Sequence, residues 1–263
     1  MLTSHNETEK VLLKTEGRIG ILKLNRPKVI NAIDLEILEQ INEKLDKVAK
    51  SDLDVLIIRG EGKGFSAGGD IKFMLTDTNK EEFYGIMDLI NQIVVKLYTL
   101  PKLVISAVHG PAAGLGFSFA LASDYIMAER SAVFAMNFIK IGLIPDGGGH
   151  FFLNKRLGEV KAKHLIWEGK VHTSQEALTM GLIDEIVNED VLLAAKKKAE
   201  EWLKMPISAM LKTKKIYTEN SKVELIRILE MEKEGQYLMR KTSDHKEGLQ
   251  AFLEKRNPIF TGK

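Results

Sequence analysis

Two glycine-rich segments offer backbone groups that could hold a ligand oxygen. Each follows a short apolar run: Gly60–Gly69 comes after Val55–Arg59, and His109–Gly116 comes after Leu103–Val108. Glycine lets backbone N–H groups approach a ligand closely, and the start of a helix leaves N–H groups without acceptors. Two such segments facing each other would form an oxyanion hole with two N–H donors. A flexible surface turn is the alternative, whereas nucleotide binding is disfavoured because the first segment lacks G-x-G-x-x-G and phosphate-loop motifs.

Asp70 and Asp146 are acidic residues that stand beside the glycine motifs. Asp146 lies in Pro-Asp-Gly, a turn sequence, and could also cap a helix that opens at residues 147–150. On the residues alone we favour the turn or cap interpretation for Asp146. Asp70 follows the first glycine segment directly.

Other common catalytic and metal-binding groups are scarce. The chain has no cysteine, which removes disulfides, thiolate nucleophiles and thiolate metal ligands. Its six histidines show neither H-x-x-x-H nor H-E-x-x-H spacing, so no metal site is expected. His109 and His150 stand near the glycine motifs and are interpreted as hydrogen-bonded structural residues.

Alternating strands and helices must position these segments. Before residue 150 the pattern predicts two hairpin strands, a helix that Asp34 caps, and buried strands before each glycine segment. After residue 150 the chain reads as mostly helical, so we predict an α/β core followed by a helical C-terminal third. The expected strands are 11–15, 19–24, 55–59, 103–108, 125–128 and the extended 182–187, and the expected helices are 34–50, 83–100, 160–169, 174–180, 190–204, 207–217, 222–240 and 245–256.

Composition and charge exclude several classes of protein. The 263 residues contain 44% hydrophobic and 28% charged residues, which is ordinary for a globular chain. The net charge of +2 argues neither for nor against a nucleic-acid or membrane-surface partner, and no DNA partner is expected. The uncharged stretch Leu103–Ser123 is long enough to cross a membrane, but Gly110-Pro111 interrupts it. We therefore predict a buried strand, a turn and a helix start there, with no membrane span. The polar N-terminus lacks an apolar signal core, so a cytoplasmic location is expected.

The sequence resembles the enoyl-CoA hydratase/isomerase family, also called the crotonase superfamily. The resemblance covers nearly the whole chain, and its motifs occur in the family's order. The motifs are NRPKVINAID (25–34), GFSAGGDIK (64–72), HGPAAGLGFSFALASDY (109–125), IGLIPDGGG (141–149), AKHLIWEGKVHTSQEALTMGLID (162–184) and EGLQAFLEKR (247–256).

This resemblance implies a fold and an assembly. The family folds as a spiral of βαβ units with a C-terminal helical trimerisation region. It therefore implies a spiral acyl-CoA-binding core over residues 1–200 and an oligomerisation region over residues 201–263. A homo-trimer or a hexamer of two trimers is expected. The substrate would be an acyl-CoA thioester, and no separate cofactor is expected because coenzyme A is carried by the substrate.

The resemblance also assigns the oxyanion donors and the catalytic group. It places the two backbone donors at Ala67 and Leu115. The two glutamates of the family's hydratases are replaced here by Ser118 and Phe138, neither of which can act as a general acid or base. Isomerase-type relatives carry their carboxylate where this chain has Asp146. Asp70 matches a family position that serves loop structure and CoA contacts, so the resemblance implies that it fixes the first glycine loop. The remaining substrate-binding residues implied are Lys28, Val29, Gly68, Gly69, Asp70, Lys72, Gly114, Ser118, Phe138, Phe252 and Lys255.

Three functions stay open at this point. An enoyl-CoA isomerase that uses Asp146 as its acid and base is favoured. A hydratase is supported by the overall resemblance and opposed by Ser118 and Phe138. A non-catalytic member that binds acyl-CoA or RNA is the third. Phe252 could equally reach a neighbouring subunit's CoA or pack in the core.

Overall fold

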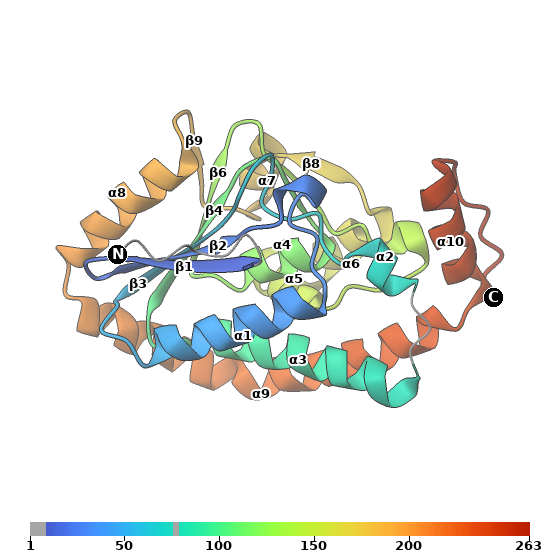
Figure 1. The fold of residues 1–263 in the computed structure, drawn as a ribbon, viewed down its shortest axis with the longest axis horizontal. Helices are drawn as coiled ribbons and strands as arrows, with labels where there is room; N and C mark the ends of the chain where they lie inside the picture. Colours follow the sequence, from blue (N-terminus) through green and yellow to red (C-terminus); the bar gives the residue numbers. More distant parts are fainter. Residues whose placement is uncertain (1–8, 76–78) are drawn as a thin grey trace.

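The computed structural model describes residues 9–75 and 79–263, so the N-terminal segment judged for a secretion signal lies outside the described residues (Figure 1). Its main sheet has six strands in the order β1-β2-β3-β4-β6-β9. β1 pairs antiparallel with β2, and all the other pairs are parallel. The bounds are β1 Val11–Glu16, β2 Ile19–Leu24, β3 Val55–Gly60, β4 Leu103–Val108, β6 Tyr125–Glu129 and β9 Glu185–Val187.

A second, smaller sheet was not predicted. It has the order β5-β7-β8, with β5 Pro111–Ala113, β7 Val133–Ala135 and β8 Val171–Thr173. These strands have three residues each, which is too short for a period of two to stand out in the sequence.

The central strands β3 and β4 are covered on both faces. Leu56 and Ile58 belong to the core beneath α1 (Leu35–Ala49) and α3 (Lys80–Tyr98). Val55 and Ile57 belong to a second core beneath α8 (Val191–Leu203). Burying one such side chain stabilises the fold by about 1.5–3 kcal/mol, which is why these strands read as unbroken apolar runs.

The first two long helices begin at capping residues. Asp34 caps α1 by accepting a hydrogen bond from the Ile37 amide at 3.0 Å, as predicted. Leu35, the first residue of α1, is 36% exposed, whereas Ile37 is fully buried against the core. α3 begins at Lys80, three residues before its predicted start, because Asn79 and Glu82 form a reciprocal capping box.

The C-terminal part contains one helix where two were predicted. Residues 207–217 and 222–240 join into α9 (Ile207–Arg240), which runs alongside α3 in Figure 1. The polar residues between them stay helical: the Ser221 hydroxyl donates to the Tyr217 carbonyl at 2.7 Å and also contacts Tyr98 of α3. The remaining helices are α2 Ile71–Met74, α4 Gly114–Leu121, α5 Gly149–Leu157, α6 Glu159–Glu168, α7 Ser174–Met180 and α10 Ser243–Glu254.

Helix α9 belongs to the main core of the chain. Its Leu225 and Leu229 are buried in the same apolar cluster as α1 and α3. The division of the chain at residue 200 stays a prediction.

The strand and the helix start predicted within Leu103–Ser123 are confirmed as β4 and α4, and the short strand β5 lies where a turn was expected. No helix in residues 9–75 and 79–263 combines the length and apolarity that a membrane span needs.

The two glycine segments leave the sheet at the same edge. β3 ends at Gly60 and β4 ends at Val108, and the two strands are parallel neighbours in which Arg59 pairs with Ala107. Ligands of parallel sheets gather at the carboxyl ends of the strands. The fold therefore brings both predicted segments to one place.

Candidate active site

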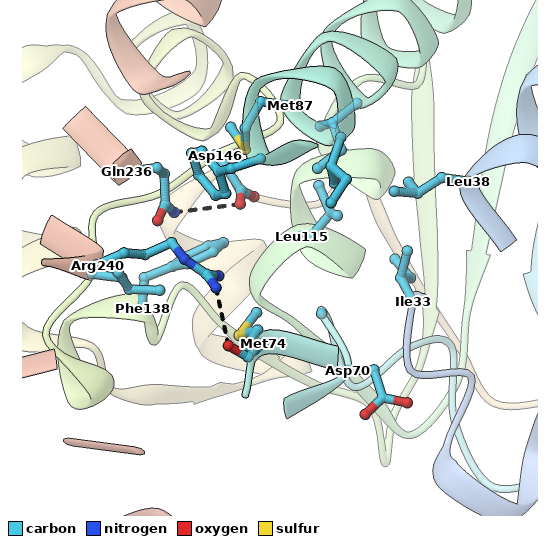
Figure 2. A pocket seen from close by; sticks show the side chains of 15 residues that line it. Ile33, Leu38, Asp70, Met74, Met87, Leu115, Phe138, Asp146, Gln236 and Arg240 are labelled. Carbon is cyan, nitrogen blue, oxygen red and sulfur yellow. Dashed lines mark hydrogen bonds between the residues drawn. The ribbon is translucent and has the colours of Figure 1, made fainter. Parts of the chain in front are cut away.

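A pocket of about 640 Å³, counting the space open to solvent, lies where the two glycine segments meet α3 and α9 (Figure 2). Its wall is mainly apolar. Gly69, Asp70, Asp146, Gln236 and Arg240 are the polar or backbone exceptions. The apolar side chains include Ile33, Leu38, Met74, Phe83, Met87 and Ile90.

The glycine segments are bonded to each other, which confirms the prediction that they face one another. The Ser66 amide donates to the Pro111 carbonyl and the Ala113 amide to the Ser66 carbonyl, both at 3.0 Å. Gly68 has φ +89°, and a Cβ there would lie 2.7 Å from the Ala113 carbonyl oxygen. Only glycine fits so close an approach.

Asn31, in the first matching motif, fixes the outer part of the first segment. It is fully buried, and its amide nitrogen donates to the carbonyls of Glu61, Gly64 and Phe65 at 3.0, 2.8 and 3.2 Å. A buried side chain with these partners holds the loop in one conformation. This explains why a motif some thirty residues earlier in the chain accompanies the glycine segment.

The assignment of an oxyanion donor to Ala67 is wrong. The Ala67 amide donates to the Ile30 carbonyl at 2.8 Å, and the Gly68 amide donates to the Ser66 hydroxyl at 3.1 Å. The Gly69 amide has no acceptor among the described residues, and Gly69 lines the pocket. The free donor of this segment is therefore two residues further along than predicted.

Leu115 carries the second free amide. It is the second residue of α4, so its N–H lies in the first turn, where no intrahelical acceptor exists. Within residues 9–75 and 79–263 no other acceptor takes this N–H. The Leu115 side chain lines the pocket, and the preceding Gly114 has φ +50° and lies against the Phe138 ring.

Asp146 is buried in the pocket wall and is 7% exposed. Its Oδ2 accepts a hydrogen bond from the Gln236 side-chain amide at 3.3 Å, while Oδ1 has no partner among the described residues. Burial, followed by the negative charge of Glu232, raises the pKa of this carboxyl well above its ordinary value. The helix-cap alternative is excluded, because α5 is capped by Gly148 without a side-chain bond.

Glu232 of α9 stabilises the turn that follows Asp146. It is 2% exposed and accepts hydrogen bonds from the Gly148 amide at 2.7 Å and from both the amide and Nδ1 of His150 at 3.0 and 2.8 Å. The carboxylate is thus occupied, and His150 has the structural role that was predicted. Figure 2 shows Gln236, one turn along the same helix, directed at Asp146.

Ser118 lies behind the pocket rather than in it. It is fully buried, it does not line the cavity, and its hydroxyl donates to the Asp146 carbonyl at 2.7 Å. The prediction of a substrate contact for Ser118 is therefore not supported, and its role is to fix the backbone of Asp146. Phe138, the other position where the family's hydratases carry glutamate, does line the pocket.

Asp70 lines the pocket but is tied to the loop. Its Oδ2 forms an ion pair with Arg26 at 2.6 Å, and its Oδ1 accepts from the Lys72 amide at 2.9 Å. Arg26 also donates to the Ala32 carbonyl at 3.0 Å. Asp70 therefore fixes the segment, as expected from the sequence.

The residues assigned to the CoA edge lie outside the pocket. Lys28, Val29, Lys72, Phe252 and Lys255 are all exposed, and none of them lines the cavity. Phe252 is 57% exposed, which rules out its packing in the core of this chain. Contacts between these residues and CoA stay predictions.

Sequence reasoning missed the α9 side of the site. Glu232, Gln236 and Arg240 come from more than 80 residues beyond Asp146. Their spacing of four residues places them on one face of α9, and this spacing was the signal available in the sequence. The sequence does not tell which face of the helix points inward, so this polar stripe could not be distinguished from a solvent-exposed one. No three metal-ligating side chains cluster anywhere in the described ranges.

Replacing Asp146 with asparagine should stabilise the fold increasingly as pH rises. The folded-state pKa of Asp146 is raised, so the wild-type stability linked to this group is complete below the unfolded pKa of about 3.9 and is lost as pH rises through the folded value. Each unit of elevation corresponds to about 1.4 kcal/mol. Asparagine cannot ionise, so the melting temperature of the variant should exceed that of the wild type by more at pH 8.5 than at pH 5. A difference in melting temperature that stays constant with pH would contradict this.

Comparisons with known proteins agree on one family. A family model described as enoyl-CoA hydratase/isomerase matches residues 14–263. YhaR of Bacillus subtilis, which bears an enoyl-CoA hydratase/isomerase name, is 44% identical over 96% of this chain and 99% of its own. The 1,2-epoxyphenylacetyl-CoA isomerase of Escherichia coli is 35% identical, with 97% and 99% covered. The crystal structure of an enoyl-CoA hydratase from Mycobacterium avium subsp. paratuberculosis superposes with a TM-score of 0.87 at 30% identity, over 96% of this chain and 99% of that one.

Proposed function

Because the chain belongs to the enoyl-CoA hydratase/isomerase family and is an enzyme of that family, we propose that it moves a double bond within an unsaturated acyl-CoA, with Asp146 carrying the proton. The observation that supports this most is which carboxyl groups of the pocket are paired with a cation. Two carboxyl groups of the described residues line it: Asp70 is paired with Arg26, and Asp146 has no cationic partner within residues 9–75 and 79–263. The pocket therefore offers one proton carrier.

One carrier is enough for isomerisation. Oδ1 of Asp146 removes a proton from C2 of a 3-enoyl thioester, the electrons move onto the thioester oxygen, and the same proton is returned to C4. The C2–H bond breaks and the C4–H bond forms, so the reaction has no net gain or loss of atoms or electrons. The raised pKa of Asp146 makes its carboxylate a stronger base toward a weakly acidic carbon.

The Gly69 and Leu115 amides would hold the oxygen of the dienolate meanwhile. Both N–H groups lack acceptors among the described residues, and both residues line the same pocket as Asp146. Preorganised backbone donors need no rearrangement when the charge develops.

Hydration is less well supported. It needs a positioned water and separate acid and base roles. Ser118 already donates its hydroxyl to the Asp146 carbonyl, and Phe138 cannot exchange a proton. The likeness to a hydratase structure supports this alternative, so the experiment includes it.

A spectrophotometric assay separates the two reactions. The protein is given 3-hexenoyl-CoA, which absorbs more strongly when it becomes the conjugated 2-enoyl product, and separately crotonyl-CoA, which loses absorbance on hydration. We expect turnover of the first and little change in the second. Rapid hydration of crotonyl-CoA without any isomerisation would show that the proposal is wrong.

We further propose a homo-trimer or a hexamer of two trimers. Apolar residues stand exposed along α9 and α10, among them Val223 at 78%, Tyr217 at 71% and Phe252 at 57%. A monomer rarely leaves so many apolar side chains in water along one region. Light scattering that gives a 29.5 kDa particle would contradict the assembly.

A further inference from the structure

Arg240, the last residue of α9, places a positive charge in the wall of the apolar pocket. Its side chain is half-buried and lies over the Phe83 ring, with 5.1 Å between the guanidinium carbon and the ring centre. One N–H donates to the Met74 carbonyl at 3.0 Å. Figure 2 shows this bond.

The guanidinium has no acidic partner among the described residues. It carries five N–H donors, of which the Met74 carbonyl takes one. The two carboxyl groups of the pocket are engaged elsewhere: Asp70 pairs with Arg26, and Asp146 is held by Gln236. Burial without a counter-charge lowers the pKa of Arg240, which is a sign of an unfavourable environment for the cation.

Other buried cations of the same helix are paired. Lys233 is 9% exposed and contacts Asp88 at 2.7 Å and Glu230 at 2.6 Å. Lys214 contacts Asp124 at 2.7 Å. Arg240 therefore departs from the pattern of its own helix, and the departure occurs inside the substrate pocket. A charge that finds no opposite charge in the described part of the chain is compensated when a ligand brings one.

We propose that Arg240 binds a carboxylate at the far end of the acyl group, so that the preferred substrate is the mono-CoA thioester of an unsaturated dicarboxylic acid. This rests on the proposed function, because it names the substrate of the same site. A guanidinium matches a carboxylate with two parallel N–H bonds, and the aromatic ring and the Met74 carbonyl hold it in one orientation.

The spacing along α9 sets the length of the acyl group. Gln236 touches Asp146, and Arg240 is four residues further on, which is about 6 Å along a helix axis. A few carbon atoms span that distance between the carbon at Asp146 and a terminal carboxylate. The side chains of Met74 and Phe83 would cover the carbon atoms between the two ends. A six-carbon diacid is the length we expect.

The test compares two substrates that differ only at the far end. 3-Hexenedioyl-CoA, thioesterified at one end, carries a carboxylate where 3-hexenoyl-CoA carries a methyl group. We expect the wild type to show a kcat/KM at least roughly tenfold higher for the diacid. Arg240→Met should lower that value by roughly 30-fold or more, since one partner of a buried charge pair is removed. Turnover of 3-hexenoyl-CoA should fall far less.

Lys241→Met is the matched control. Lys241 is the next cation along the chain, is exposed, and lies over the Tyr237 ring rather than in the pocket. The Lys241→Met variant should leave the ratio of kcat/KM for the two substrates unchanged. Thermal melts of both variants show whether the fold is intact.

Binding of saturated analogues separates this inference from the proposed function. Calorimetry with adipoyl-CoA and hexanoyl-CoA needs no turnover, so a preference for the diacid that Arg240→Met abolishes supports the inference even if neither enoyl-CoA is isomerised. If Arg240→Met weakens both analogues equally, the guanidinium holds CoA itself and the inference is wrong. An unchanged ratio of the two affinities in the variant would likewise overturn it.

Discussion

Asp146→Asn is expected to lower kcat for double-bond migration by roughly 10²- to 10⁴-fold, with little change in KM. Asparagine keeps the shape of the side chain and the contact with Gln236, but it cannot accept a proton from carbon. In the wild type, kcat/KM should rise with pH across the raised pKa of Asp146, because the base must be ionised to act. The variant's residual rate should lack that rise. Initial rates with 3-hexenoyl-CoA across pH check both effects.

Two further variants make this result specific. Asp88→Asn is the same chemical change at an exposed carboxylate outside the pocket, and it should leave kcat unchanged. Ser118→Ala removes the hydroxyl that fixes the Asp146 carbonyl, so a moderate fall of up to about tenfold is expected, in keeping with one lost hydrogen bond. Near-wild-type turnover by Asp146→Asn would mean that another group carries the proton.

Removing the N–H of Gly69 or Leu115 should lower kcat by roughly 10²- to 10³-fold each. Side-chain substitution cannot test a backbone donor, so the amide is replaced by an ester, with the matching α-hydroxy acid incorporated at that position. The ester oxygen keeps the chain geometry and cannot donate to the developing oxyanion. Single-turnover rates with 3-hexenoyl-CoA report the loss without interference from product release.

Ala67 provides the matched control for these esters. Its N–H donates to the Ile30 carbonyl, so an ester there should cost about 1 kcal/mol of stability and leave kcat close to that of the wild type. The opposite pattern, with activity lost at position 67 and kept at position 69, would restore the assignment made from the sequence.

The error at Ala67 shows what the motif can and cannot predict. The segment SAGGD predicts a backbone donor, since glycines allow close approach, and the structure does place it against the second segment. Which N–H remains free depends on which carbonyls lie nearby. Ile30, more than thirty residues earlier, takes one donor, and the Ser66 hydroxyl takes the next. Sequence spacing does not contain that information.

The long helix shows a second limit of sequence reasoning. A polar interval between residues 217 and 222 is typical of a break between two helices. Here Ser221 bonds to the preceding turn and to Tyr98 of α3, so tertiary packing keeps the helix continuous. Continuity brings Gln236 and Arg240 into the pocket. By contrast, Asp146 could be found from its motif through the family resemblance, although the local turn sequence alone favoured a turn or cap.

The pocket combines main-chain groups with side-chain groups, and this difference bears on how the substrate preference of such an enzyme can diverge. The oxygen-holding groups at Gly69 and Leu115 belong to the main chain, so a point mutation elsewhere leaves them in place. In the proposed substrate complex, by contrast, the far end of the acyl group meets a side chain, Arg240, which stands one turn beyond Gln236 on α9. Exchange at position 240 can therefore change the accepted acyl group while the enolate chemistry is inherited intact. We expect paralogues with new substrates to differ along this part of α9 first.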